Sequence, residues 1–321
     1  MMVIGIFIGA AYGFISSRGQ FCMNSGFSDV GRKKDTVKLK AFITAILVQA
    51  SFLPVFISVV RYFGGDFAYS IGFPHLYNTA TIAGGFLFGV GMHYAGGCGA
   101  GIFFKAGERN TGAMIAVLGF VLGVALAYRE PLYSIMTSAR GKILYEQTPL
   151  WGLEKAIVSS LIVSLTSGAA LYYMLKKNKE QKPTGAGWGW KKTGLGVGVT
   201  GIVAWLYAMS VDQPFGMSVI PGALDITYQM FSWAVMFLLG IPIGAYVATE
   251  KKQVKMAFPK TEIIIKRLMG GIVLGVAGAF GAGCTMGHGL TFTPLLGVGS
   301  IIGILSIFAG SYTVGYLTRK K

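Results

Sequence analysis

Charged side chains are scarce in this sequence. Asp, Glu, Lys and Arg together make up 12% of the 321 residues, and hydrophobic residues make up 53%. A soluble domain carries about 25% charged residues. Most of the surface must therefore face something other than water, which excludes an ordinary soluble domain and predicts an all-α integral membrane protein.

Acidic residues and cysteines are scarcer still. There are 12 Asp and Glu residues against 28 Lys and Arg, which gives a net charge of +16. The basic residues cluster in short segments between long apolar runs, so they do not indicate a nucleic-acid binder. No Asp or Glu falls inside an apolar run, which argues against an acidic cation pore and against a proton pump with buried carboxylates. Three widely spaced cysteines without a CxxC pair are not a disulfide framework.

Nine apolar runs are candidates for membrane spans, because a helix needs about 20 apolar residues to cross a bilayer. With nine spans every strongly basic segment lies on one side, which predicts an external N-terminus and a cytoplasmic C-terminus. We expect the first run to be a retained span and the segment 129–154 to be an external loop. The nine runs are 3–17, 42–60, 82–104, 112–128, 156–175, 195–211, 229–249, 269–290 and 298–317.

Two segments of the chain repeat each other. Residues 84–104 read GGFLFGVGMHYAGGCGAGIFF, and residues 270–290 read GGIVLGVAGAFGAGCTMGHGL. They align without a gap and pair Cys98 with Cys284. In the nine-span arrangement the first copy starts outside and the second starts inside, so the repeat predicts two inverted halves of a single transmembrane domain. The first half is 1–128, the linking loop and span are 129–193, and the second half is 194–321.

Transporters built from inverted halves place their sites near the bilayer midplane, where the halves meet. The glycine-rich stretches around Cys98 and Cys284 are poor helix interiors, since each glycine costs about 1 kcal/mol relative to alanine. Irregular backbone at membrane depth survives only where it is buried in protein or lines a polar cavity. Amides freed in such a break form an anion nest. The candidate residues of the two breaks are Gly97, Cys98, Gly99, Gly283, Cys284 and Thr285.

The apolar runs contain no fixed charge, and what remains there are weak neutral donors such as thiols and imidazole. These suit a soft, polarisable anion that must bind and then leave. His288 follows Cys284 by four residues and either orients the substrate or bonds to the backbone. Cys22 with the neighbouring Asn24 forms a third candidate position, and Lys105 ends the first repeat as a candidate exit residue. No cofactor or metal is expected.

Other glycines recur at a spacing of four residues. Gly5, Gly9 and Gly13 lie on one face of the first apolar run, and Gly240 and Gly244 lie on one face of the seventh. Small residues at this spacing let two helices approach closely in a membrane. These two runs are predicted to contain helix-packing faces.

Several motifs together resemble the YeeE/YedE family of bacterial inner-membrane proteins. They are RGQFCM (18–23), AGGCGAGIFFKAGERN (95–110) and GAGCTMGHGL (281–290). The resemblance implies a pseudo-symmetric protein that takes up thiosulfate for sulfur assimilation. It also implies that Cys22, Cys98 and Cys284 line the central path and pass the anion along by hydrogen bonds to its terminal sulfur. A small cytoplasmic TusA-like sulfur-carrier protein is the partner that the family implies.

These observations leave three hypotheses about function. The leading hypothesis is thiosulfate uptake through a thiol-lined path, and family members linked to selenium leave a selenium or other sulfur species as an alternative substrate. A membrane sulfurtransferase would need an activated thiolate with a nearby base. A soft-metal transporter would use Cys and His ligands, but the sequence has no CxxC pair, the motifs have no Met cluster, and the apolar runs have no acidic residue.

Overall fold

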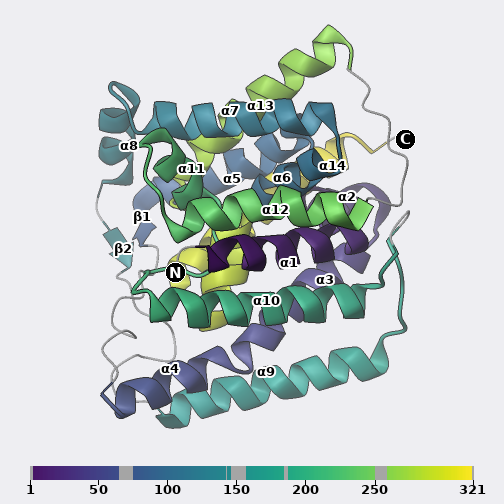
Figure 1. The fold of residues 1–321 in the computed structure, drawn as a ribbon, viewed down its shortest axis with the longest axis vertical. Helices are drawn as coiled ribbons and strands as arrows, with labels where there is room; N and C mark the ends of the chain where they lie inside the picture. The colour runs from purple at the N-terminus through teal and green to yellow at the C-terminus, as the bar shows by residue number, and fades with distance from the viewer. Residues whose placement is uncertain are drawn as a thin grey trace.

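The computed structural model describes residues 3–64, 75–141, 143–145, 157–183, 187–249 and 259–319, and its described part is almost entirely helical. The predicted all-α membrane class is confirmed. Most helices lie side by side with their axes along one direction (Figure 1). The helices are α1 (Ile4–Gly19), α2 (Met23–Lys33), α3 (Val37–Ala50), α4 (Leu53–Tyr62), α5 (Asn78–Ala95), α6 (Gly99–Gly107), α7 (Thr111–Ala127), α8 (Leu132–Arg140), α9 (Ile157–Lys177), α10 (Trp190–Ser210), α11 (Ile220–Thr227), α12 (Trp233–Thr249), α13 (Thr261–Phe280), the π-helix η2 (Thr285–Phe292), the 3-10 turn η3 (Thr293–Leu295) and α14 (Val298–Leu317).

One short ladder is the exception to the helical fold. Strand β1 (Leu76–Tyr77) pairs antiparallel with β2 (Ile143–Tyr145), and it joins the segment before α5 to the segment after α8. It lies at the end of the bundle that also carries α8 and α11 (Figure 1). Within the expected external loop 129–154, the described part therefore contains a short helix and a strand.

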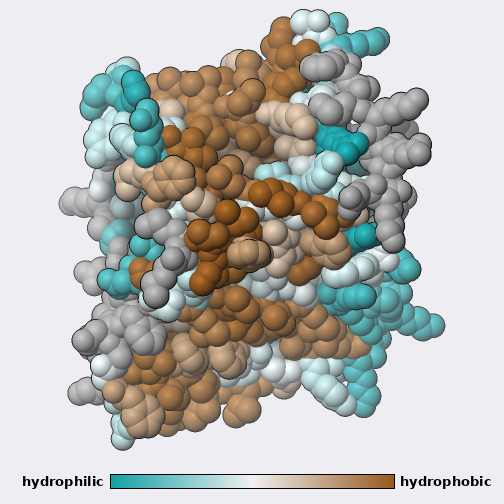
Figure 2. Space-filling view, viewed as in Figure 1, coloured by the Kyte–Doolittle hydropathy of each residue, from teal (hydrophilic) through white to brown (hydrophobic). Residues whose placement is uncertain are grey.

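The surface has the pattern of a membrane protein. Hydrophobic residues cover the middle of the face drawn in Figure 2, and hydrophilic residues gather toward its two ends. At one end, which we call the basic end, α9 finishes with Lys176 and Lys177 and α10 begins just before Lys191 and Lys192. At the opposite end lie α8, α11 and the ladder (Figure 1). The helix axes therefore run across the apolar band.

Six segments in the described part are long and apolar enough to cross a membrane, or seven if the bent pair α7 and α8 is one span. The predicted first and seventh runs form α1 and α12, which have only 16 and 17 residues. The predicted total of nine spans therefore stays a prediction. The six are Val37–Tyr62, Thr79–Gly107, Ile157–Lys177, Trp190–Ser210, Thr261–Phe280 and Val298–Leu317.

The predicted glycine faces of α1 and α12 are confirmed as packing surfaces. Gly9 lies against the backbone of Phe237 and Gly240, and Gly244 lies against the backbone of Ala10. A Cβ on either glycine would overlap the partner helix. By contrast, α9 packs at the edge of the bundle against α3 and α4, and most of its side chains are exposed.

The two sequence repeats pack against each other in a reciprocal way. Gly84 of α5 lies against Gly281 at the end of α13, and Gly270 of α13 lies against Tyr94 and Ala95 at the end of α5. Gly84 and Gly270 are equivalent in the repeat, so the two helices exchange corresponding contacts. This arrangement is what two antiparallel copies of one unit would make, and it supports the predicted inverted relation of the halves.

The same reciprocity extends to the neighbouring helices. Gly89 of α5 lies against the backbone of Ile307 and Ser311 in α14, and the equivalent Gly275 of α13 lies against Phe120 and Val124 in α7. Each long helix of the repeat therefore packs closely against the long helix that follows the other copy.

Each repeat then breaks at the same place. Helix α5 ends at Gly96, which has a φ of +81°, and the equivalent Ala282 after α13 has a φ of +59°. The left-handed residue turns the chain, and a short helix starts three residues later in both copies: α6 after Cys98 and η2 after Cys284. The fold thus brings two helix breaks with their cysteines into the interior.

Candidate functional site

All three cysteines occupy the same kind of position. Cys22 is the N-cap of α2, Cys98 is the N-cap of α6 and Cys284 is the N-cap of η2, each with an extended backbone. The three thiols are free, and their residues are at most 4% exposed. An N-cap residue lies where the first backbone N–H groups of a helix have no intrahelical partner. Each thiol therefore lies at the positive end of a short, buried helix.

The thiols of Cys22 and Cys98 face each other. A Cβ added to Gly101 would lie 2.9 Å from Cys22 Sγ and 3.0 Å from Cys98 Sγ, so both sulfur atoms border the space beside this glycine. The two thiols are close enough to interact electrostatically. The N-termini of α2 and α6 thus meet at a pair of thiols.

Cys284 lies next to this pair. Its Sγ accepts a hydrogen bond of 3.4 Å from the backbone N–H of Gly287, and Val219 lies nearby, with its Cγ2 2.8 Å from a Cβ added to Gly99. A Cβ on Gly99, beside Cys98, would lie 3.8 Å from Cys284 Cβ. Val219 is itself the N-cap of α11. Four short helices therefore point their N-termini into one buried region, which we call the thiol centre.

The thiol centre is electrostatically suited to an anion. The partial positive charge of a helix N-terminus and its free N–H groups stabilise a bound anion without a charged side chain. Lys105, at the end of α6, is close enough to Cys22 to interact with it electrostatically, and its Nζ donates a 2.6 Å hydrogen bond to the carbonyl oxygen of Gly96. Lys105 therefore adds positive charge toward the basic end.

A carboxylate lies beyond Lys105 at the same end. Glu108 Oε1 accepts hydrogen bonds from Ser17 Oγ at 2.6 Å and from Gln20 Nε2 at 3.1 Å. These bonds tie the end of α6 to the end of α1. The negative charge of Glu108 is thus held by neutral donors.

The predicted site residues fall into one region. Gly97 and Gly99 flank Cys98 in the first break, and Gly283 precedes Cys284 in the second. Two predicted polar residues carry buried oxygen atoms that have no hydrogen-bond partner among the described residues: Asn24 Oδ1 and Thr285 Oγ1. A buried polar atom without a partner is uncommon in a native protein and calls for an explanation. An anion in the thiol centre would supply one for Thr285, whose hydroxyl can donate, but not for Asn24 Oδ1, which only accepts.

His288 makes contacts of another kind. Its Nε2 lies 3.0 Å from the carbonyl oxygen of Gly281, and its Nδ1 lies 3.3 Å from Ser300 Oγ. A carbonyl only accepts, so Nε2 donates to it. Of the two roles predicted for His288, the geometry fits backbone bonding, because both ring nitrogens are engaged with protein atoms. The imidazole joins the break after α13 to the start of α14.

Replacing His288 with alanine is expected to lower the free energy of unfolding by about 3 kcal/mol, because two buried hydrogen bonds are lost and a cavity is left. Thermal unfolding of the detergent-solubilised protein measures this. Ser300→Ala removes one of the two bonds and should cost about 1 kcal/mol. Equal melting temperatures for wild type and His288→Ala would show that the imidazole does not hold the break.

Two residues of the thiol centre escaped the sequence prediction. Tyr12 of α1 is buried and lies within electrostatic range of all three cysteines. Ser218 lies against Gly287, where a Cβ would come within 3.3 Å of its Oγ. The resemblance of Phe215-Gly216-Met217 to Phe21-Cys22-Met23 could have indicated Ser218, but Tyr12 lies in an ordinary apolar run and left no signal.

Comparison with known proteins agrees with this description. A family profile described as sulphur transport matches residues 18–313. The chain is 25% identical to the thiosulfate transporter TsuA of Escherichia coli (strain K12) over 99% of this chain and 94% of that protein. It is also 25% identical to the thiosulfate transporter TsuA of Spirochaeta thermophila over the full length of both chains. The resemblance seen in the sequence motifs is thereby confirmed.

Proposed function

The chain belongs to the sulphur-transport family, and from this premise we propose that it carries thiosulfate across the membrane through the thiol centre. The curated relatives that span its whole length are thiosulfate transporters. The observation that carries the proposal is the position of the cysteines: three thiols cap three buried helix N-termini that meet in one region.

The chemistry of these groups matches the ion. Thiosulfate is a divalent anion with oxygen atoms at one end and a polarisable sulfur at the other. The backbone N–H groups and the helix dipoles stabilise its charge. The thiols donate weak hydrogen bonds to its terminal sulfur. No single thiol traps the ion, because each hydrogen bond contributes about 1.5–3 kcal/mol and is replaced by the next.

The proposal includes an order of the cysteines. Cys284 borders the break nearest the end that carries α8 and α11, and the pair Cys22 and Cys98 lies toward the basic end with Lys105. The ion passes from Cys284 to the thiol pair and then to Lys105. Tyr12 lies within electrostatic range of all three thiols and contributes a hydroxyl to the same passage.

The direction of transport and its purpose belong to the same proposal. The basic end faces the cytoplasm of a bacterium, as lysine-rich loops favour, so the N-terminus lies outside and the C-terminus inside. The protein then resides in the inner membrane and supplies sulfur for assimilation. A TusA-like sulfur-carrier protein receives the product at the basic end.

The test is transport by the purified protein in liposomes. Uptake of radiolabelled thiosulfate should exceed uptake of sulfate at least about tenfold, because sulfate lacks the terminal sulfur and the hydrogen bond that it accepts, worth about 1.5 kcal/mol or more. Selenite is the third substrate to compare. Empty liposomes provide the background. Uptake of thiosulfate no faster than this background would refute the proposal, and faster uptake of selenite would reassign the substrate.

A further inference from the structure

Two adjoining cavities lie at the end of the bundle opposite the basic end. The larger has a volume of about 660 Å³ and the smaller about 230 Å³, and they share the wall residues Tyr128, Phe215, Ile220 and Pro221. The smaller cavity is also lined by Gly283 and Gly287. Gly283 precedes Cys284, and the N–H of Gly287 donates to its sulfur, so the smaller cavity ends beside the backbone that surrounds the buried Cys284 thiol.

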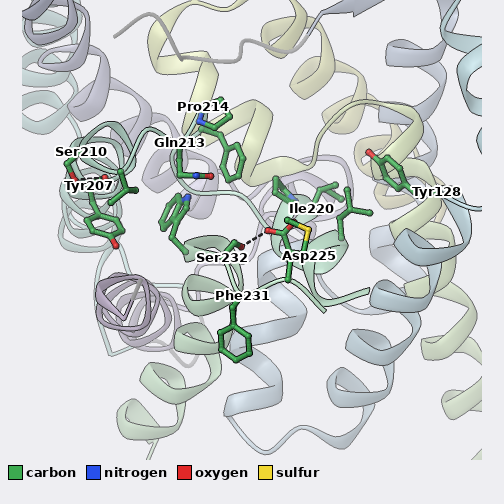
Figure 3. A pocket seen from close by; sticks show the side chains of 15 residues that line it. Tyr128, Tyr207, Ser210, Gln213, Pro214, Ile220, Asp225, Phe231 and Ser232 are labelled. Atoms are coloured by element: carbon green, nitrogen blue, oxygen red, sulfur yellow. Dashed lines mark hydrogen bonds between the residues drawn. The ribbon is translucent and has the colours of Figure 1, made fainter. Parts of the chain in front are cut away.

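The larger cavity offers little to an anion. Aromatic and aliphatic side chains from the segment before α11 and from the start of α12 dominate its wall (Figure 3). Its one lining carboxylate, Asp225, accepts a hydrogen bond from Ser232 Oγ, drawn as the dashed line in Figure 3. No Lys or Arg is among the residues that line it. A small anion therefore gains no charge pairing until it reaches the smaller cavity.

Arg140, the last residue of α8, lines the smaller cavity. One guanidinium nitrogen donates a 2.6 Å hydrogen bond to the carbonyl oxygen of Ala279, and the Cζ atom lies 5.1 Å from the ring centre of Tyr77. Within the described ranges, no carboxylate lies within ion-pair distance of Arg140. Its Nε is buried and has no hydrogen-bond partner among the described residues.

Among the described residues, these contacts leave most of the donors of Arg140 without a partner. A guanidinium has five N–H donors in a planar fork that matches the oxygen atoms of a carboxylate, sulfate or phosphate group. A buried donor without a partner is costly. The Tyr77 ring and the Ala279 carbonyl hold the side chain in place on the wall of the cavity. The side chain is thus preorganised on the wall of the cavity that adjoins both the larger cavity and the backbone beside Cys284.

We propose that Arg140 captures the oxyanion end of thiosulfate in the smaller cavity before the ion reaches Cys284. The inference rests on the proposed function. The guanidinium binds the oxygen atoms, and the terminal sulfur is left to meet the Cys284 thiol. The bond to Ala279 alone would give Arg140 only a structural role, as a cap at the end of α13. The experiments below separate the two roles.

The first experiment measures thiosulfate uptake in proteoliposomes for Arg140→Gln, Arg140→Lys and the control Arg129→Gln. Arg129 is exposed at the junction of α7 and α8, so its replacement removes the same charge from the same end. Arg140→Gln should raise KM about tenfold with kcat changed less than twofold, since a lost charge-assisted hydrogen bond has this effect. The KM of Arg140→Lys should lie between those of the wild type and Arg140→Gln, and the KM of Arg129→Gln should stay within twofold of the wild-type value.

An unchanged KM in a folded Arg140→Gln protein would overturn the proposal, even if its melting temperature falls as a lost helix cap would predict. Absence of thiosulfate uptake by the wild type would instead refute the proposed function.

A second experiment uses the unmodified protein and so does not depend on a variant folding. An arginine-specific dicarbonyl reagent modifies the protein with and without thiosulfate, and peptide mass spectrometry quantifies each site. Thiosulfate should protect Arg140 severalfold and leave Arg129 unprotected, whereas chloride at equal ionic strength should protect neither. Equal modification of Arg140 in thiosulfate and in chloride would overturn the proposal.

Discussion

Replacing Cys98 or Cys284 with alanine is expected to reduce the initial rate of thiosulfate uptake at least about tenfold. Each substitution removes one thiol donor at a helix N-terminus, and a hydrogen bond to a charged group contributes about 1.5–3 kcal/mol. This range corresponds to about tenfold to a hundredfold in a rate or affinity. The measurement is uptake of radiolabelled thiosulfate by proteoliposomes that contain equal amounts of each variant.

A buried serine far from the thiols provides the control. Ser164 of α9 is buried, and its Oγ lies 3.4 Å from the carbonyl oxygen of Ala50. Ser164→Ala removes one atom from a buried side chain, as the cysteine substitutions do, and should leave uptake unchanged. Thermal unfolding of all three variants separates lost folding from lost transport. If folded Cys98→Ala and Cys284→Ala proteins transport at the wild-type rate, the thiols do not carry the ion.

The largest expected effect on stability comes from the glycines that hold the repeat together. A Cβ at Gly89 would come 2.7 Å from the Ser311 nitrogen, and a Cβ at the equivalent Gly275 would come 2.6 Å from the Val124 nitrogen. These neighbours are backbone atoms, which cannot move aside as a flexible side chain does. Gly89→Ala and Gly275→Ala should each destabilise the protein by about 3 kcal/mol, the upper end of the usual cost of overpacking.

Gly168 in α9 offers a matched control, since a Cβ there would meet only the Ser51 Cβ at 3.9 Å. Gly168→Ala should be neutral or stabilising, because alanine is the better helix former. Thermal unfolding in detergent and the monodisperse fraction on gel filtration report the result. Because the packing is reciprocal, Gly89→Ala and Gly275→Ala are expected to lower the stability of the protein by similar amounts. A large loss for only one of them would contradict the equivalence of the two halves.

Features that depend on local composition were predictable from the sequence. The repeat, the two helix breaks and the close-packed faces of α1 and α12 all follow from where glycine occurs in apolar runs. The breaks fall where the glycines cluster, after Ala95 and after Phe280. Cys98 and Cys284 were identified because the repeat aligns them. These parts of the prediction needed no knowledge of tertiary contacts.

Features that depend on contacts between distant segments were not predictable. The meeting of Cys22 with Cys98 requires α2 and α6 to approach each other, and nothing in either segment specifies this. Tyr12 reaches the thiols only because α1 passes beside them. From the sequence, Arg140 was expected to lie in the external loop 129–154, where an arginine is ordinarily solvated. In the fold α8 carries it to a cavity wall beside the end of α13.

The N-cap position of the three cysteines has a consequence for genetics. The positive potential of the thiol centre arises from N–H groups of the main chain, which every residue except proline carries. A side-chain substitution leaves these groups in place, so a scan for essential charged residues would not detect them. Selection for loss of function should instead recover replacements that reshape the backbone, such as proline or bulky residues in the two breaks. At the helix N-termini of the thiol centre, the recognition of charge is thus specified by chain path rather than by residue identity.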